Sequence, residues 1–437
     1  MLSVPSSVCL QSILMQRDNT TFAIYQGNEI DWQQFLTHVL QTSQRLPAKA
    51  QAINLCDNRY LFIVAFLAVV VRQQSNLLPA NKTSNTIAEL LAAFPDSYCL
   101  TDDDLDFISN KDCALPAGQI KSQVLINTAR VVATAFTSGS TGQPKRIDKT
   151  WRELQHGACL AVERFKLSQQ PWEIISTVPP QHMYGLETSL FWPLFSSLTI
   201  NGSRPFFPAD ICRQVKHCKP SCLLVSTPKH LQACSQTALM WHHLAMILCS
   251  TAPLSCNNAE SIEKNLCSPL WEIIGSTETL SYASRRTAAT QQWQLYATLN
   301  LIKTGAGFKL SGGHLQEPIT LDDQFEIDAD GYFTLQGRSS DLIKVAGKRA
   351  SLMALNSILI GLDDVSDAVF YPTEQERLAA LVVSKRGKQE LLLALKQYID
   401  EVFLPRPLHF VNKLPRNELG KIDKSELKQL IKACEHA

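Results

Sequence analysis

The sequence lacks a hydrophobic run long enough to cross a bilayer, and it lacks an excess of charge of either sign. The longest apolar stretch lies near Tyr60–Val71, well short of the ~20 residues that a membrane-spanning helix needs. Met1–Pro5 has no basic region leading into an apolar core, so no signal peptide is expected. The formal net charge of +1 gives no electrostatic case for nucleic acid or an anionic membrane. We therefore expect no nucleic-acid partner, no stable membrane insertion and a cytoplasmic location.

Paired cysteine motifs are also missing. The thirteen cysteines are an odd number and include no CxxC pair, which favours reduced thiols over a disulfide framework. Cys212, His217, Cys218 and Cys222 are close in sequence, but their spacing fits no standard zinc pattern, and free cysteines are often simply buried. We expect no metal there.

The length and the order of predicted elements indicate an α/β protein with more than one domain. The chain has 437 residues, 45% of them hydrophobic and 19% charged, which suits a globular protein too large for a single core. Residues 21–25 and 52–55 are predicted strands, whereas residues 31–45 and 58–71 have helical patterns. Strands that alternate with helices predict a parallel sheet.

One glycine- and hydroxyl-rich stretch, residues 137–145, follows the predicted buried strand 131–136. Glycine allows a sharp turn and a close backbone approach, and successive N–H groups in such a turn can bind an anion. The candidate phosphate-binding residues are Thr137, Ser138, Gly139, Ser140, Thr141, Gly142 and Lys145. The common phosphate loop has four residues between its glycines and a Ser or Thr after its lysine, unlike this stretch. A loop around a polyphosphate is the functional interpretation, and a flexible surface hairpin is the alternative.

Further polar turns follow predicted strands along the chain. They contain His182 and Gly185, then Ser250 and Ala252, and then Ile274, Gly275, Ser276, Thr277 and Glu278. In open α/β sheets, ligands bind at the carboxyl ends of the strands. Taken alone, His182 is better explained as a histidine packed or capped in a loop, and Glu278 as a solvated residue of a turn.

The last third of the chain adds three candidate positions. Asp322 and Asp323 precede a turn at Asp330–Gly331, Arg338 begins a polar stretch, and Lys421 follows Gly420 near the end. Taken alone, the stretch after Gly337 is an ordinary linker, and Lys421 is a solvated lysine.

In this order, the motifs resemble those of the adenylate-forming superfamily, and specifically the acyl-CoA synthetase type. The resemblance covers nearly the whole chain. It implies a large α/β N-terminal domain of sheets plus a distorted β-barrel (residues 1–337), a hinge (338–341) and a small mobile α+β C-terminal domain (342–437). In that last domain, residues 367–371, 378–383 and 409–411 are predicted strands, and residues 388–402 are a predicted helix.

The resemblance also implies roles for the candidate residues. His182 and Gly185 would line the carboxylate pocket, and Ser250 and Ala252 would lie along adenine and the acyl group. Thr277 would contact the α-phosphate, and Glu278 would hold Mg²⁺. Asp323, or else Asp322, would bind the ribose together with Arg338, and Lys421 would catalyse adenylation.

Two positions depart from the family pattern. Ile274 stands where an aromatic side chain usually stacks on adenine, so apolar contact remains but ring stacking is lost. Ser340 stands where the hinge usually has an acidic residue, and Asp341 is a second candidate for the pivot.

The implied reaction uses ATP and Mg²⁺ to convert a small carboxylic acid into acyl-AMP, followed by thioester formation with coenzyme A or carrier-protein phosphopantetheine. No Asp stands at an obvious position for binding an amino group, which favours an aryl or fatty acid. The alternatives are a stand-alone protein that loads only an acyl carrier protein, and a non-catalytic nucleotide-binding relative.

Overall fold

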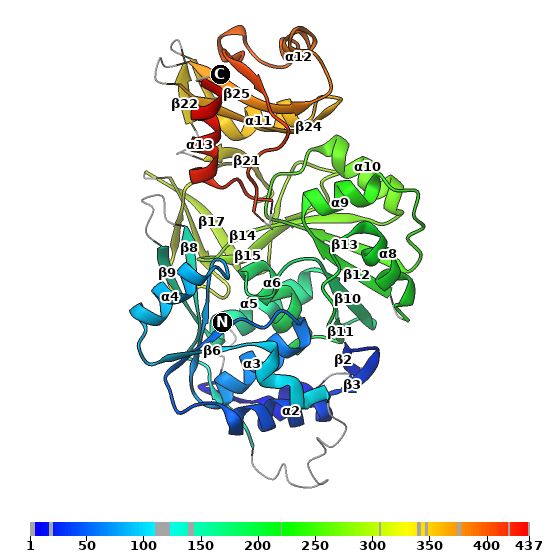
Figure 1. Cartoon of the computed structure of the whole chain (residues 1–437), viewed down its shortest axis with the longest axis vertical. Coiled ribbons are helices and arrows are strands. Elements are labelled where there is room, and N and C mark those ends of the chain that lie inside the picture. The colour runs from blue at the N-terminus through cyan, green and yellow to red at the C-terminus, as the bar shows by residue number, and fades with distance from the viewer. Residues whose placement is uncertain are drawn as a thin grey trace.

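The structure is a computed structural model, and it describes residues 5–16, 21–109, 123–138, 144–219, 221–305, 307–338, 342–345, 348–373, 377–417 and 420–435. Two open sheets dominate the chain up to about residue 295, and the C-terminal strands and helices gather at one end of the molecule (Figure 1). Residues 139–143 and 339–341, which hold part of the predicted phosphate loop and most of the predicted hinge, lie outside the described residues.

The first sheet has five strands, and four of them are parallel. In spatial order they are β6 (Ser97–Leu100), β4 (Gln51–Asn54), β5 (Ser75–Leu78), β8 (Val131–Ser138) and β9 (Pro144–Thr150). Only β9 is antiparallel to its neighbour. The parallel sheet expected from alternating strands and helices is therefore confirmed.

The second sheet has nine strands with a parallel centre and antiparallel edges. In spatial order they are β16 (Gln294–Leu295), β15 (Leu280–Arg285), β14 (Leu270–Ser276), β13 (Leu244–Cys249), β12 (Ser221–Ser226), β10 (Trp172–Ser176), β11 (Leu198–Asn201), β2 (Thr21–Tyr25) and β3 (Asn28–Asp31).

Both faces of this sheet are covered, as alternating side chains show. Ile175, Leu224 and Ile247 belong to one apolar cluster with residues of α8 (Pro208–His217), α9 (Pro228–Ser235) and α10 (Cys256–Leu266), which lie beside β12 and β13 in Figure 1. Their neighbours Ile174, Leu223 and Leu248 belong to the larger cluster on the other face. Cys212, Cys218 and Cys222 pack within the first of these clusters.

Polar side chains cap the starts of several helices. Asp31 caps α2 (Trp32–Arg45), and Thr150 caps α5 (Trp151–Arg164), each in a reciprocal capping box. The Asn58 side chain accepts hydrogen bonds from two backbone amides at the start of α3 (Arg59–Val71). The other helices before residue 300 are α1 (Leu10–Met15), α4 (Ser84–Ala93), α6 (Met183–Leu186) and α7 (Trp192–Leu194), with 3-10 turns at Asp102–Ser109 and a π-helical segment at Glu187–Phe191.

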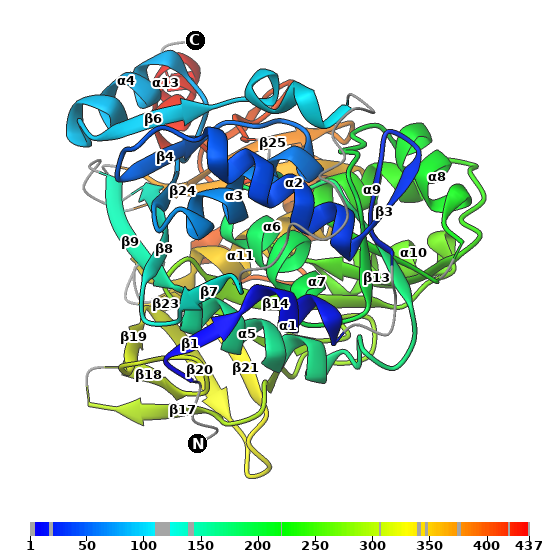
Figure 2. The ribbon, with the colours of Figure 1, turned by 90° about the horizontal axis from the view of Figure 1, so that it is seen from below.

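Smaller antiparallel sheets complete the N-terminal part. β1 (Ser7–Cys9) and β7 (Leu125–Asn127) pair although they are far apart in sequence, and Figure 2 shows them side by side. Where the barrel-like region is expected, the strands form two small sheets. These are β17 (Leu299–Thr304), β18 (Gly307–Gly312) and β19 (Ile319–Leu321), and then β20 (Asp323–Ile327) with β21 (Phe333–Arg338).

The chain from Leu342 onward has its own apolar clusters. Its elements are β22 (Leu342–Val345), β23 (Lys348–Ser351), α11 (Leu352–Ile360), β24 (Val365–Pro372), β25 (Leu378–Ser384), α12 (Lys388–Leu395), β26 (Leu408–Phe410) and α13 (Lys424–Glu435). Ala380 and Val382 of β25 pack in one cluster, whereas Ala379 and Leu381 pack in another, which α13 covers. Thus each face of the β24–β25–β26 sheet carries its own cluster.

The helix predicted over residues 388–402 is wrong in extent. α12 ends at Leu395, and a separate 3-10 turn forms at Glu401–Phe403. The Asp400 side chain accepts a hydrogen bond from the Val402 amide and starts this new turn, as a short polar side chain often does.

Among the described residues, no helix combines the length and the apolar character needed to cross a bilayer.

Gly185 allows α6 to pack directly on the segment that follows β10. A Cβ atom at Gly185 would lie 2.1 Å from the Pro179 carbonyl oxygen and 3.1 Å from the Pro180 Cα. Both neighbours are backbone atoms, so they cannot rotate away as a flexible side chain could. The position therefore requires glycine for reasons of space.

We predict that Gly185→Ala lowers the free energy of unfolding by about 1–3 kcal/mol, because the added methyl group overpacks this contact. Gly305→Ala is the matched control, since a Cβ there meets nothing within 4 Å and its φ is not positive. Urea unfolding of both variants measures the difference. Equal stability of the two variants would contradict the packing argument.

Candidate nucleotide-binding site

The carboxyl ends of four neighbouring strands form one edge of the nine-stranded sheet. β10, β12, β13 and β14 are parallel and adjacent, so the turns that follow them meet at this edge. Tyr184 strengthens the arrangement, because its hydroxyl lies 3.0 Å from the Leu248 carbonyl oxygen of β13. The Ser250 hydroxyl donates to the Ile273 carbonyl of β14 at 3.0 Å.

The predicted residues His182, Ser250 and Ala252 lie in these turns. His182 is partly buried and directly precedes α6. Between Ser250 and Ala252, Thr251 has a φ of +89°. A positive φ is unfavourable for a β-branched residue and is a form of strain that collects at ligand sites. The turn after β13 is therefore a credible binding segment by its own geometry.

The hairpin between β14 and β15 carries the next group of predicted residues. β14 contains Ile274, Gly275 and Ser276, and the connecting turn presents Thr277 and Glu278, both partly exposed. The Ser276 amide donates to the Thr279 hydroxyl at 3.0 Å, and the Thr279 amide donates to the Ser276 hydroxyl at 3.2 Å. These reciprocal bonds hold the base of the turn closed.

Glu278 brings the two large sheets together. The Lys145 ammonium, on β9 of the first sheet, lies 3.4 Å from the Glu278 carboxylate on the second. Burial alone would raise the pKa of Glu278, but hydrogen bonds to its own backbone and to Ser276, together with the charge of Lys145, lower it below its ordinary value. The carboxylate is therefore ionised and able to hold a cation.

The backbone register places the start of the predicted phosphate loop beside this pair. Thr137 of β8 lies opposite Lys145, and Ser138 lies opposite Pro144. Gly139, Ser140, Thr141 and Gly142 lie outside the described residues. The two ends of the loop are thus fixed at the edge where Glu278 stands.

Asp323 and Arg338 face each other as cross-strand partners. Asp323 begins β20 and Arg338 ends β21, so the two residues lie at the same end of this antiparallel pair, with their Cα atoms in register. Asp322 lies outside β20 and is exposed. The register favours Asp323 over Asp322 as the partner of Arg338, and the ribose role of both residues stays a prediction.

Lys421 lies on a tight loop of the C-terminal part. Its amide donates to the Asn417 side-chain oxygen at 3.0 Å, and Gly420 has a φ of +77°, which favours glycine. Arg416 donates to the Gly420 carbonyl and forms an ion pair with Asp367 of β24. These bonds fix the loop to its own sheet, and the adenylation role of Lys421 stays a prediction.

Three buried polar residues and one half-buried glutamate near the hairpin were not singled out from the sequence. Lys149, Glu153, Glu187 and His314 lie close to the Thr277–Glu278 turn. Burial raises the pKa of Glu187 to about 7, although hydrogen bonds from Ser281 and the charge of Lys149 act in the opposite direction. Burial lowers the pKa of His314 to about 4, so His314 is neutral near pH 7. Only Glu153 had a sequence signal, as the fourth residue of the capping box that begins at Thr150.

The donor set fits a magnesium ion held mainly by phosphate oxygens. Glu278 is the one carboxylate at the tip of the turn, and the described residues contain no group of three or more His, Cys, Asp or Glu able to cage a metal. Mg²⁺ typically takes one or two carboxylates, while phosphates and waters complete its shell. Glu278 is therefore suited to Mg²⁺ that arrives with a nucleotide.

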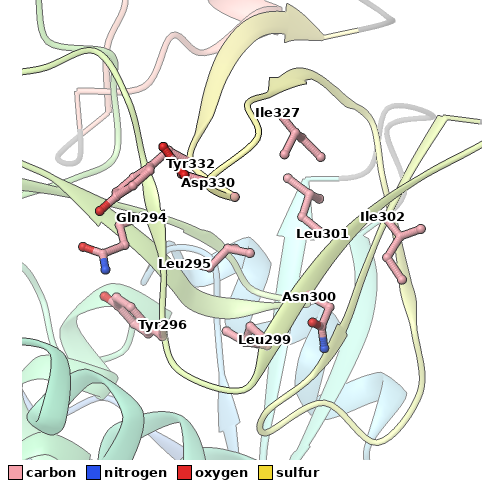
Figure 3. A pocket seen from close by; sticks show the side chains of 11 residues that line it. Gln294, Leu295, Tyr296, Leu299, Asn300, Leu301, Ile302, Ile327, Asp330 and Tyr332 are labelled. Carbon is pink, nitrogen blue, oxygen red and sulfur yellow. The ribbon is translucent and has the colours of Figure 1, made fainter.

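A hollow of about 470 Å³ lies on the surface away from these motifs (Figure 3). It opens among β16, β17 and the turn between β20 and β21, with Leu295, Leu301, Ile302 and Ile327 among its lining residues. Asp330 is the one acidic or basic side chain that lines it. This composition supplies no set of groups for catalysis.

Glu187 predicts a pH dependence of stability. Its pKa rises from an ordinary 4.5 to about 7 on folding, so between these values the folded protein holds a proton that the unfolded chain has lost. The free energy of unfolding should therefore fall as pH rises from about 4.5 to 7, by on the order of 2 kcal/mol. Glu187→Gln should remove this contribution, and the His314 contribution, which has the opposite sign, is common to both proteins. Unfolding curves of the two proteins at pH 5, 6, 7 and 8 measure the difference, and parallel pH profiles would contradict it.

Comparison with known proteins agrees with this geometry. Residues 37–310 match the model of the family described as AMP-binding enzyme. A 4-coumarate–CoA ligase of Cereibacter sphaeroides is 26% identical over 308 residues, covering 66% of this chain and 69% of that protein. An L-allo-isoleucine:holo-[CmaA peptidyl-carrier protein] ligase of Pseudomonas savastanoi is 22% identical, covering 97% of this chain and 82% of that protein.

Solved structures show the same fold. The o-succinylbenzoate CoA synthetase of Bacillus subtilis with its acyl-adenylate intermediate aligns with a TM-score of 0.83 at 16% identity, covering 97% of this chain and 99% of that one. An anthranilate CoA ligase in complex with anthranoyl-AMP aligns with a TM-score of 0.82 at 16% identity, covering 99% of each chain. The expected α/β fold is confirmed, and the chain belongs to the AMP-binding enzyme family within the adenylate-forming superfamily.

Proposed function

We propose that this protein uses ATP to activate a carboxylic acid as acyl-AMP and then transfers the acyl group to a thiol. The observation that carries the proposal is the contact between Lys145 and Glu278 at the edges of two sheets. The Lys145 ammonium can bind phosphate, and the Glu278 carboxylate can bind Mg²⁺. Family membership and the CoA-ligase relatives support the same reaction class.

In the first step, a carboxylate oxygen of the acid attacks the α-phosphorus of ATP, and pyrophosphate leaves. Lys145 and the amides of the Thr137–Lys145 loop bind the departing phosphates, and Thr277 holds an α-phosphate oxygen. Lys421 joins the acid carboxylate and the α-phosphate. Mg²⁺, when bound at Glu278, offsets negative charge on the phosphates. Positioning and charge neutralisation account for most of the acceleration in such a reaction.

In the second step, the thiol sulfur attacks the acyl carbonyl carbon, and AMP leaves. Residues 342–437 rotate about residues 338–341 between the steps, withdrawing Lys421 and admitting the thiol. The separate apolar clusters from residue 343 onward support a unit that moves as one body.

The acid is aromatic or fatty, and coenzyme A is the first candidate thiol. Relatives named as ligases of 4-coumarate, 3-hydroxybenzoate and 2-succinylbenzoate support an aryl acid. A carrier-protein thiol is the second candidate, because the relative whose match spans 97% of this chain is a carrier-protein ligase. The experiment is a panel of aryl, fatty and amino acids assayed for pyrophosphate release, with coenzyme A, with a holo-carrier protein and with neither. If none of the acids in the panel causes pyrophosphate release, the non-catalytic alternative is favoured.

We predict that Lys421→Ala lowers acid-dependent ATP–pyrophosphate exchange by more than about 10²-fold, because a charge placed at the reacting groups is lost. ATP binding by calorimetry should change little. Lys413→Ala is the matched control, because Lys413 is an exposed lysine of the same segment. Undiminished exchange in Lys421→Ala would refute the assigned role.

A substitution at Ile274 is predicted to tighten AMP binding. Ile274→Tyr should tighten AMP binding by about 0.5–1.5 kcal/mol, which is roughly two- to tenfold, because an aromatic ring can stack on adenine where Ile274 offers only apolar contact. Ile274→Leu, which adds no ring, is the control. Calorimetry with AMP measures both variants, and equal affinities would show that position 274 does not face the base.

A further inference from the structure

One buried lysine lies under the Thr277–Glu278 turn and has no role in the proposed reaction. Lys149 is the second-last residue of β9 and lies four residues after Lys145. Side chains alternate along a strand, so residues 145 and 149 lie on the same face of β9. The Lys145 side chain is 63% exposed, whereas that of Lys149 is only 3% exposed. Strand β9 therefore places the Lys145 ammonium in the cleft and the Lys149 ammonium beneath it.

Both lysines bind the same residue at different atoms. The Lys145 Nζ lies 3.4 Å from the Glu278 carboxylate, and the Lys149 Nζ donates to the Glu278 backbone carbonyl oxygen. Lys149 thus fixes the backbone of the turn, while Lys145 meets its side chain. The contact joins β9, which carries one end of the phosphate loop, to the residue suited to Mg²⁺.

The ammonium of Lys149 is retained at an energetic cost. Burial lowers the pKa of Lys149, and the charges of Glu153, Glu187 and Glu278 oppose this change. The Glu153 carboxylate lies 3.7 Å from the Lys149 ammonium. A buried lysine is a weak source of stability compared with an apolar side chain of similar volume. Its presence is better explained by the position that it imposes on Glu278.

Two further buried side chains hold the same hairpin from other elements. His314 Nε2 lies 2.6 Å from the Thr279 carbonyl oxygen, and because a carbonyl oxygen can only accept, this nitrogen carries the proton that it donates. The Glu187 carboxylate accepts from the Ser281 amide at 3.0 Å and from its hydroxyl at 2.6 Å. The backbone from residue 278 to residue 281 is therefore held at three places by side chains distant in sequence.

The turn is not closely packed on the side of Lys149. A hollow of about 390 Å³ opens there, bordered by Lys149, Glu153, Glu278 and Gln316 among others. Apolar packing therefore does not fill the space beside the turn. The polar contact from Lys149 is what ties the turn to β9 at this place.

We propose that Lys149 is a positioning residue that sets the spacing between the phosphate-loop strand and the Thr277–Glu278 turn before nucleotide binds. The proposal rests on the proposed function for the identity of the ligand. Under that function, β9 and the Thr277–Glu278 turn would bind the phosphates and the metal ion of one nucleotide. The proposal predicts a rigid turn in the ligand-free protein, and this rigidity can be measured without catalytic turnover.

The test compares Lys149→Met with Lys149→Arg in the full chain. Methionine keeps the length and apolar volume but removes the donor, whereas arginine restores a charged donor. Lys82→Met is the matched control, because Lys82 also donates to two backbone carbonyls, those of Leu55 and Cys56, which directly follow β4 of the first sheet. Two properties are measured. The first is amide hydrogen exchange of residues 278–281 in the absence of ligands, and the second is the pair of KM values for MgATP and for the acid.

We expect Lys149→Met to speed exchange at residues 278–281 and to raise the KM for MgATP, each by about tenfold, the size typical when a residue that orients a binding group is removed. The KM for the acid should change little. Lys149→Arg should recover most of both effects, and Lys82→Met should show neither. Unchanged exchange at residues 278–281 in a folded Lys149→Met protein would overturn the proposal.

A second variant decides the case if Lys149→Met does not fold. Glu153→Gln removes the carboxylate partner of Lys149, while glutamine still completes the capping box of α5. Exchange should then increase at residues 278–281 and stay unchanged in α5, and unchanged exchange at the turn would count against the proposal. If exchange responds as expected but the wild-type protein consumes no ATP with any acid, the proposed function fails and the structural role of Lys149 stands.

Discussion

The attachment of Glu278 to strand β9 is the contact on which the site depends. The predicted binding segments belong to two different sheets, and neither sheet alone contains enough of them to hold a nucleotide. Lys145 and Lys149 join the sheets at the carboxylate and at the backbone of the same residue. The partly exposed pair with Lys145 is weak and easily exchanged for a ligand. The buried contact with Lys149 is protected from water and is the more persistent of the two.

The buried polar groups beneath the turn illustrate how a rigid site is obtained in a region where close packing stops. A turn that presents Thr277 and Glu278 to solvent cannot be covered by apolar side chains on its outer side. Hydrogen bonds from Lys149 and His314 to successive carbonyl oxygens fix the backbone from the inner side. Burial keeps His314 neutral and holds the pKa of Glu187 near 7, so the network carries less charge than its composition suggests. Such preorganisation limits the ordering that nucleotide binding would require.

Much of the fold and part of the site follow from local sequence. The helices predicted over residues 31–45 and 58–71 correspond to α2 and α3, and glycine and hydroxyl residues marked the turns at the carboxyl ends of the strands. The burial of Lys149 could not be predicted from the sequence. The stretch Lys145–Lys149 contains four charged residues out of five and has the composition of an exposed edge strand. Lys149 is buried because a hairpin about 130 residues later in the sequence packs over it, a contact that only the tertiary structure specifies. For the same reason, Glu187 resembles an ordinary polar helix residue until its bonds to Ser281 are seen.

The placement of Lys421 on a separate unit has a physical rationale under the proposed function. A lysine that must enter the site for one step and leave it for the next cannot belong to a loop of the large sheets, because the buried network holds those segments still. Arg416 ties the loop of Lys421 to Asp367 and to the Gly420 carbonyl, so Lys421 moves only if the whole C-terminal sheet moves. That sheet has apolar clusters on both faces, and its own residues supply them, so the unit can turn without exposing its core. Under the proposed function, the turn around Glu278 and Lys421 would therefore have complementary parts: the turn would keep the nucleotide in place, while movement of Lys421 would change the chemistry that the cleft supports.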